Sequence, residues 1–168
     1  PFKEQTLQVG ELQSAALAPL KIYAKERGIE VDVQSDIDPV ETLFGDAHHL
    51  TFVLSSLLHN AVRFSPSSGR VELSITRRAD NVFFQVVNHP AIAAEDLAHV
   101  FTEFSTAGIE EHGEGHALSL AVSREIIKGH GGELYAETTA ENQTCFVMTL
   151  ALKPTTDADR TSQAVLNN

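Results

Sequence analysis

One long amphipathic pattern constrains the fold of this chain more than any other feature of its sequence. Between Asp46 and Phe64 the apolar residues recur at steps of three and four: Leu50, Val53, Leu54, Leu57, Leu58, Ala61 and Val62. A helix with this spacing carries a continuous apolar stripe that has to be buried against other elements. Asp46 is of a residue type that caps helix N-termini. The pattern therefore predicts a core-facing helix over residues 46–64.

Shorter patterns on both sides of this helix predict a mixture of strands and helices. A helical pattern runs from Leu7 to Lys25 and stops at Arg27-Gly28, and Pro19 within it implies a kink or a late start. Alternating or continuous apolar residues predict strands over 29–34, 40–44, 71–75, 82–87, 132–137 and 145–152.

The turn at residues 80 and 81 joins two of these strands into a hairpin. Further helices are expected over 95–104 and 116–128, with a loop at 108–115 between them. Hairpins with helices gathered between them predict an α+β fold, a two-layer α/β sandwich in which helices cover one face of a mixed sheet.

Length and charge restrict the class of protein. A chain of 168 residues with 42% hydrophobic content has room for one domain. We expect this domain to span residues 1–152 and the polar segment 153–168 to be a disordered tail. No apolar run approaches the ~18 residues of a membrane span, so no membrane contact is expected within the chain. The net charge of −11, with scattered basic residues, argues against a nucleic-acid partner.

The cysteine content bears on the cellular compartment, and the first residue bears on the domain organisation. Cys145, the single cysteine, lies in an apolar run, so we expect it to be a core residue rather than a nucleophile. The absence of a disulfide framework fits a reducing compartment, and we expect a cytoplasmic location. Because the chain begins at Pro1 rather than at Met, we expect it to be a domain of a longer protein.

The predicted helix over residues 46–64 also has a polar stripe. Ser56, Asn60 and Arg63 lie together at about 100° per residue, opposite the apolar stripe. Taken alone, such a stripe is more typical of an ordinary solvated helix face than of a binding site. The wider sequence favours a binding site instead.

Residues 45–66 read GDAHHLTFVLSSLLHNAVRFSP, which resembles the asparagine box of histidine kinase ATPase domains. The resemblance implies a Bergerat-type ATP-binding fold. It further implies that Asn60 is a catalytic residue and ligates Mg²⁺, that Arg63 is catalytic and contacts the ATP phosphates, and that Ser56 replaces a second asparagine common in the family. A hard cation such as Mg²⁺ takes oxygen ligands and retains several waters, which is consistent with an amide oxygen in this role.

Three further segments continue the resemblance in the family's order, so that it covers about residues 7–152. Residues 100–104 (VFTEF) resemble the phenylalanine box, which implies that Phe101 and Phe104 pack under an ATP lid. Residues 113–122 (GEGHALSLAV) resemble the second glycine box, followed by a typical helix-to-strand segment at 125–134 (EIIKGHGGEL). This implies that Gly113 and Gly115 approach phosphates at a helix N-terminus, with Leu118 lining the site.

The sequence also departs from the family. Residues 87–92 (VNHPAI) stand where the first glycine box is expected, so Asn88 replaces the aspartate that reads the adenine amino group, Ile92 ends the segment, and neither glycine is present. An amide oxygen still accepts a hydrogen bond but lacks the charge assistance of a carboxylate. On this basis Asn88→Asp is expected to tighten ATP binding.

Two other departures concern the phosphates. Ala117 stands where the second box usually has glycine, and the lid carries Glu110 and Glu111 but no basic residue. Added acidic residues oppose the binding of a polyphosphate unless metal or distance screens them.

Three functions follow from these motifs. The first is the catalytic domain of a two-component sensor histidine kinase, which binds ATP and Mg²⁺ and passes the γ-phosphoryl group to a histidine on a separate dimerisation domain, with a response regulator as the next partner. The second is a degenerate domain that binds nucleotide weakly or not at all and acts as a signalling interaction module. A serine kinase of the anti-sigma-factor type is less favoured, because those proteins retain the glycine boxes.

Overall fold

The computed structural model describes residues 2–99 and 116–153. Its elements follow in the order β1 (Glu4–Gln8), α1 (Val9–Leu17), α2 (Leu20–Glu26), β2 (Glu30–Ser35), β3 (Thr42–Asp46), α3 (Ala47–Phe64), β4 (Arg70–Arg78), β5 (Asn81–His89), α4 (Ala94–His99), α6 (His116–Gly129), β6 (Glu133–Thr138) and β7 (Thr144–Ala151).

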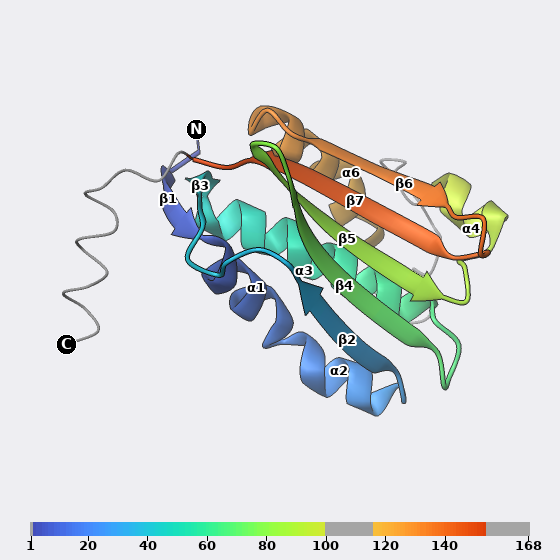
Figure 1. The fold of residues 1–168 in the computed structure, drawn as a ribbon. Helices are drawn as coiled ribbons and strands as arrows, with labels where there is room; N and C mark the ends of the chain where they lie inside the picture. The colour runs from blue at the N-terminus through green and yellow to red at the C-terminus, as the bar shows by residue number, and fades with distance from the viewer. Residues whose placement is uncertain (1, 100–115, 154–168) are drawn as a thin grey trace, which may run out of the picture.

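The described strands form two sheets. The larger sheet has five strands in the order β2-β4-β5-β7-β6, and β1 pairs with β3 in a separate two-stranded sheet. Strand β2 runs parallel to β4, whereas the other pairs of the larger sheet are antiparallel. Helices α3 and α6 lie behind the larger sheet in Figure 1, and α3 packs against both α1 and α6. This arrangement confirms the prediction of an α+β two-layer sandwich with a mixed sheet.

Helix α3 forms the centre of the core. Its N-cap is Asp46, whose Oδ1 accepts a hydrogen bond of 3.1 Å from the His49 backbone N–H, as the sequence predicts. The seven residues of the apolar stripe are all fully buried, and burying a single leucine side chain of this kind contributes about 1.5–3 kcal/mol. The helix ends where Ser65 adopts an extended conformation ahead of Pro66.

The beginning of the chain differs from the sequence-based prediction. Residues 4–8 form strand β1 rather than the start of a helix, because they pair with β3 in a register that places Leu7 opposite Leu43. The single predicted helix is two helices, α1 and α2, with Pro19 as the N-cap of the second. Proline has no backbone N–H to continue the α1 ladder. Strand β3 begins two residues later than the 40–44 prediction and ends at the helix cap itself.

Several other predictions concern residues outside the described part. Helix α4 begins at Ala94, close to the predicted start, and residues 100–104 of the predicted helix are not described. The predicted loop at 108–115 and most of the predicted tail, residues 154–168, also lie outside it. Among the described helices, none has both the length and the apolar character needed to cross a membrane.

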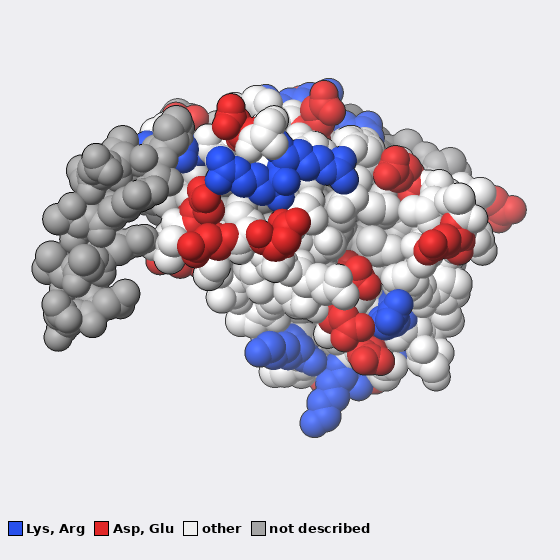
Figure 2. Space-filling view, viewed as in Figure 1, with Lys and Arg blue, Asp and Glu red and all other residues white. Residues whose placement is uncertain are grey.

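Charged side chains of both signs share the surface. Figure 2 shows Lys and Arg side chains next to Asp and Glu side chains on the face viewed in Figure 1, with uncharged surface between them. Two of the described ion pairs join strand β4 to neighbouring segments: Arg77 Nη1 lies 2.8 Å from Glu41 Oε1, and Arg70 Nη1 lies 3.9 Å from Asp32 Oδ2. On this face the charges are interspersed.

Candidate functional site

Asn60 lies in the C-terminal half of α3 and is only 1% exposed. Its Nδ2 donates a hydrogen bond of 2.8 Å to the backbone carbonyl of Ser56, one turn earlier. This bond determines which way the amide faces. Asn60 Oδ1 is buried and has no hydrogen-bond partner in the described part of the chain. The Asn60 side chain therefore has one oxygen acceptor that no described residue satisfies.

The polar stripe of α3 is not a solvated face. Ser56 is 4% exposed, Asn60 is buried and Arg63 is half-buried. Burial of polar groups costs free energy unless a partner satisfies them. An ordinary solvated helix face therefore does not describe this stripe.

Asn88 lies near the end of β5 and is fully buried. Its Nδ2 donates to two acceptors at the end of α3: the Ala61 carbonyl at 2.6 Å and Ser65 Oγ at 2.9 Å. Ser65 Oγ donates in turn to the Ala61 carbonyl at 2.8 Å. Asn88 Oδ1 has no hydrogen-bond partner among the described residues. These contacts bring Asn88 beside the helix turn that carries Asn60.

Thr144 and Ile92 complete this buried polar cluster. Thr144 opens β7, pairs with Asn88 across the sheet and is fully buried. Its Oγ1 accepts a hydrogen bond of 2.7 Å from the Ile92 backbone N–H. Ile92 itself is 5% exposed. The predicted site residues Asn88 and Ile92 are therefore held together by a threonine from the last strand.

Sequence reasoning missed Ser65 and Thr144. Each hydroxyl has its partners in the buried cluster rather than in solvent, so both belong to the candidate site. Ser65 stands directly before Pro66 at the end of a predicted helix, and Thr144 begins a predicted strand. A single hydroxyl residue at an element boundary is common, and no spacing in the sequence distinguishes these two from ordinary turn residues.

Arg63 lies in the last turn of α3, where its guanidinium carbon is 5.6 Å from the centre of the Phe64 ring. Its backbone carbonyl accepts a hydrogen bond of 3.0 Å from Arg27 Nη2. Asn60 and Arg63 are three residues apart, so they lie next to each other on one face of α3, close to its C-terminal end.

Two backbone N–H groups in the segment after β5 already have acceptors within the protein. The Ala91 N–H donates to the Asn142 carbonyl at 3.2 Å, and the Ile92 N–H is bound by Thr144. Backbone donors that already have partners are not available to a ligand. The missing glycines therefore coincide with a segment whose N–H groups are used within the protein.

The remaining predicted site residues, or their side chains, fall outside the described part of the chain. Phe101, Phe104, Gly113 and Gly115 lie outside the described residues, and Leu118 lies in α6 with its side chain outside them.

The opposite end of α3 is held by an electrostatic cluster. Hydrogen bonds from the His49 backbone, the His49 ring and the Lys3 backbone hold the pKa of Asp46 well below its usual range. The Asp46 N–H donates to His130 Nε2 at 3.0 Å, while His130 Nδ1 lies 2.8 Å from the Ile126 carbonyl. The cluster ties the start of α3 to α6, and it positions the helix rather than contacting the candidate site.

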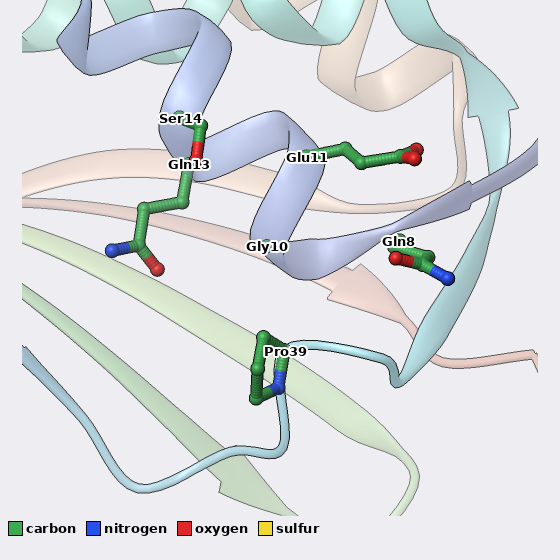
Figure 3. A pocket seen from close by; sticks show the side chains of 6 residues that line it. All are labelled: Gln8, Gly10, Glu11, Gln13, Ser14 and Pro39. Carbon is green, nitrogen blue, oxygen red and sulfur yellow. The ribbon is translucent and has the colours of Figure 1, made fainter. Parts of the chain in front are cut away.

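A surface pocket lies at the N-terminus of α1 and is shown in Figure 3. It is lined by Gln8, Gly10, Glu11, Gln13, Ser14 and Pro39. No lysine or arginine lines it, and it shares no residue with the Asn60 and Asn88 cluster. The backbone N–H groups of Val9 and Gly10 are already bonded to the carbonyls of Glu41 and Pro39. The pocket is therefore a poor match for a phosphate group.

Comparison with known proteins gives consistent matches. A profile of the family described as histidine kinase-, DNA gyrase B-, and HSP90-like ATPase matches residues 45–154. Adaptive-response sensory kinase SasA of Prochlorococcus marinus (strain MIT 9303) is 29% identical over 157 residues, which cover 89% of this chain. The chain spans only 41% of the length of that protein.

Solved structures share the fold at lower sequence identity. The nucleotide-free catalytic domain of histidine kinase ThkA has a TM-score of 0.75 at 22% identity, covering 89% of this chain and 96% of that one. ThkA in complex with the response regulator protein TrrA has a TM-score of 0.72 at 21% identity, covering 90% of this chain and 42% of that one. Full-length ShkA in complex with AMPPNP has a TM-score of 0.74 at 21% identity, covering 90% of this chain and 32% of that one.

The profile match includes α3 with Asn60 and Arg63, the strand with Asn88, and Thr144 on β7. It covers more than half of the chain, and the fold agrees with that of the ThkA catalytic domain over 89% of this chain. The sequence and the fold are similar to those of histidine kinases, and this chain belongs to the histidine kinase-, DNA gyrase B-, and HSP90-like ATPase family.

Proposed function

We propose that this domain binds ATP together with Mg²⁺ and passes the γ-phosphoryl group to a histidine on a separate dimerisation domain. One observation carries the proposal. Asn60 and Asn88 are both buried, both direct their amide nitrogen to fixed acceptors, and both keep an amide oxygen without a partner among the described residues. Buried acceptors without partners are rare in folded proteins and call for an explanation. A bound nucleotide and metal would satisfy both.

Asn60 fits the metal side of such a site. Its free atom is an oxygen, the ligand type that Mg²⁺ prefers, and the Ser56 carbonyl keeps the amide nitrogen turned away. When bound, Mg²⁺ would neutralise phosphate charge during phosphoryl transfer. Arg63, one turn further along, would orient the phosphates by charge-assisted hydrogen bonds. The contribution of this helix is positioning, since phosphoryl transfer needs little covalent chemistry from the protein.

Asn88 fits the adenine side. Its Oδ1 would accept a hydrogen bond from the exocyclic amino group, and its two Nδ2 bonds to α3 hold that oxygen in place. Ile92 supplies an apolar neighbour held by Thr144. The phosphate-binding roles of Gly113 and Gly115, and the packing roles of Phe101, Phe104 and Leu118, are part of the same proposal.

The partners and location are also proposals. This chain spans less than half of the length of its SasA relative, and we propose that the phosphoryl acceptor belongs to another domain of the same or an adjacent protein. The ThkA complex with TrrA supports a response regulator as the further partner. We place the proposed phosphoryl transfer in the cytoplasm, where ATP is available.

One observation favours a second candidate, a degenerate domain that acts as a signalling interaction module. The backbone N–H groups of Ala91 and Ile92, in the place of the first glycine box, are bonded within the protein. A segment closed in this way would leave adenine recognition to Asn88 alone. Weak or absent nucleotide binding would then follow.

Calorimetric titration with ATP and MgCl₂ separates the two candidates. For the kinase domain we expect a dissociation constant in the micromolar range, about −8 kcal/mol, and loss of most of this affinity in Asn60→Ala. Asn81→Ala is the matched control, because Asn81 is an exposed asparagine at the start of β5. An absence of heat at millimolar nucleotide would overturn the kinase proposal. Micromolar binding that Asn60→Ala abolishes would overturn the interaction module.

A further inference from the structure

The phosphate side of the proposed site lies at the C-terminal end of α3, where the helix dipole is unfavourable for an anion. Asn60 and Arg63 are in the last turns of α3, which ends at Phe64. Unpaired carbonyl groups give the C-terminal end of a helix a partial negative charge, equivalent to about half an elementary charge. A polyphosphate bound there would be repelled by this charge. Something near the end of α3 has to offset the repulsion.

Arg27 is positioned to do this. It caps the C-terminus of α2, and its Nη2 donates a hydrogen bond of 3.0 Å to the backbone carbonyl of Arg63. That carbonyl is one of the terminal groups of α3 that have no partner within the helix. The bond therefore places a permanent positive charge directly on the negative end of the nucleotide-facing helix.

Arg27 is also held in place by an aromatic side chain. Its guanidinium carbon lies 6.0 Å from the centre of the Tyr23 ring, one turn earlier on α2. The Tyr23 ring stacks on His59 of α3, with ring centres 4.2 Å apart and planes 2° from parallel. Since His59 immediately precedes Asn60, the stack links the α2 support to the turn that carries the proposed metal ligand.

The described residues use little of the hydrogen-bonding capacity of Arg27. Its Nε is buried and has no hydrogen-bond partner in the described residues, and none of the described ion pairs involves Arg27. An arginine with a nearby carboxylate would have its charge neutralised, whereas this charge remains available to the helix end.

We infer that Arg27 is a positioning residue of the nucleotide site, which neutralises the C-terminal end of α3 and thereby favours ligands that carry several phosphate charges over those that carry few. This inference rests on the proposed function of the domain. Arg27 acts through the Arg63 backbone and needs no contact with the nucleotide. A residue that only stabilised the fold would affect all adenine ligands alike.

The test compares ATP with AMP, each displacing a fluorescent ATP analogue in the presence of MgCl₂. Arg27→Gln keeps a hydrogen-bond donor and removes the charge, and Arg27→Lys keeps the charge on a different donor. Arg78→Gln is the matched control, since it removes one positive charge at the far end of the nine-residue strand β4, where the Arg78 guanidinium lies over Phe83. Thermal unfolding without nucleotide reports whether each variant is folded.

For Arg27→Gln we expect ATP affinity to fall about two- to fivefold, the range of a single helix-end charge, and AMP affinity to fall by clearly less. The difference should shrink in 0.5 M salt, where the Debye length falls to about 4 Å. Arg27→Lys should recover most of the ATP affinity, and Arg78→Gln should change neither ligand.

Equal losses for ATP and AMP in Arg27→Gln, or no loss for either, would overturn the role of Arg27 while leaving the proposed function intact. If Arg27→Gln does not fold, Arg27→Lys still decides, because wild-type ATP affinity supports the charge role and equal losses for both ligands contradict it. Wild-type protein that binds no ATP would overturn both the inference and the proposed function.

Discussion

The Asn88 side chain is bonded to the Ala61 backbone carbonyl through its amide nitrogen, at a distance of 2.6 Å. The bond crosses from the end of β5 to the last turns of α3, and both groups are buried. Because the carbonyl accepts and cannot donate, the partner atom of Asn88 has to be a nitrogen. The bond therefore determines which atom of residue 88 remains for a ligand.

Asn88→Asp is expected to destabilise the domain. A carboxylate would place an oxygen against the Ala61 carbonyl, and the single Ser65 hydroxyl can donate to only one of these two buried acceptors, at a cost of about 1–3 kcal/mol. Urea unfolding at pH 7 measures the change, with Ser65→Ala as a milder comparison that removes only one partner. These contacts also lead us to expect no gain in ATP affinity, the opposite of what the sequence alone favours. An unchanged unfolding midpoint together with tighter ATP binding would contradict this account.

Thr144→Val is expected to cost about 1–3 kcal/mol of unfolding free energy, because it leaves the buried Ile92 N–H without its acceptor. Thr149→Val is the matched control on the same strand. The Thr149 hydroxyl accepts from the exposed Glu133 N–H at 3.1 Å, where water can take its place. Chemical denaturation of the two variants compares them directly, and equal effects would show that burial of the Ile92 N–H is unimportant.

Asp46 should make the stability sensitive to acid. Its pKa is lowered in the folded state, so its ionised form stabilises the fold above the unfolded-state pKa of about 3.9, and this contribution is lost as the pH falls further. Asp46→Asn keeps acceptors for the His49 N–H but removes the charge. We expect the variant to be less stable than wild type at pH 7 and the difference to narrow below about pH 4. Urea unfolding between pH 2.5 and 7 measures this, where the range is set by about one unit below and three above that pKa. A constant difference would exclude ionisation of Asp46 as the cause.

Cys145 should react slowly with alkylating reagents in the folded protein. Burial, with a smaller contribution from the Glu137 carboxylate, raises the pKa of its thiol to about 11. The thiolate fraction at pH 8 is then about 10⁻³, compared with roughly a quarter for an ordinary thiol, and the thiolate is the reactive form. We expect iodoacetamide labelling to be at least about 100-fold faster in urea than in buffer. Equal rates would mean that Cys145 is accessible and ionised.

The same shift predicts a loss of stability in alkali. The unfolded chain releases the Cys145 proton at a lower pH than the folded protein does, so stability should fall as the pH rises from about 9 towards 11. Cys145→Ala should flatten this fall, and unfolding midpoints across that range provide the measurement.

Local sequence was sufficient to predict those helices and strands whose periodicity and capping residues lie within the element itself. The apolar spacing of residues 46–64 determined α3, including its cap at Asp46, because helix periodicity and capping depend on neighbours one turn away. The β4–β5 hairpin was equally predictable from the alternation on both sides of its turn. The order of the motifs around Asn60 was sufficient to indicate the family.

Only the tertiary structure decided which atoms face the candidate site. Strand β1 exists because β3, far along the chain, supplies its hydrogen bonds, and a local helical pattern could not report that partner. Contacts between elements distant in sequence likewise bury Asn60. They also place the Asn88 amide nitrogen against the Ala61 carbonyl and the Thr144 hydroxyl against the Ile92 N–H. The sequence by itself determined which side chains are available for binding. Packing between distant elements determined their burial, their partners and the two amide oxygen atoms that have no partner among the described residues, because a side chain's hydrogen bonds depend on neighbours brought together only by the fold.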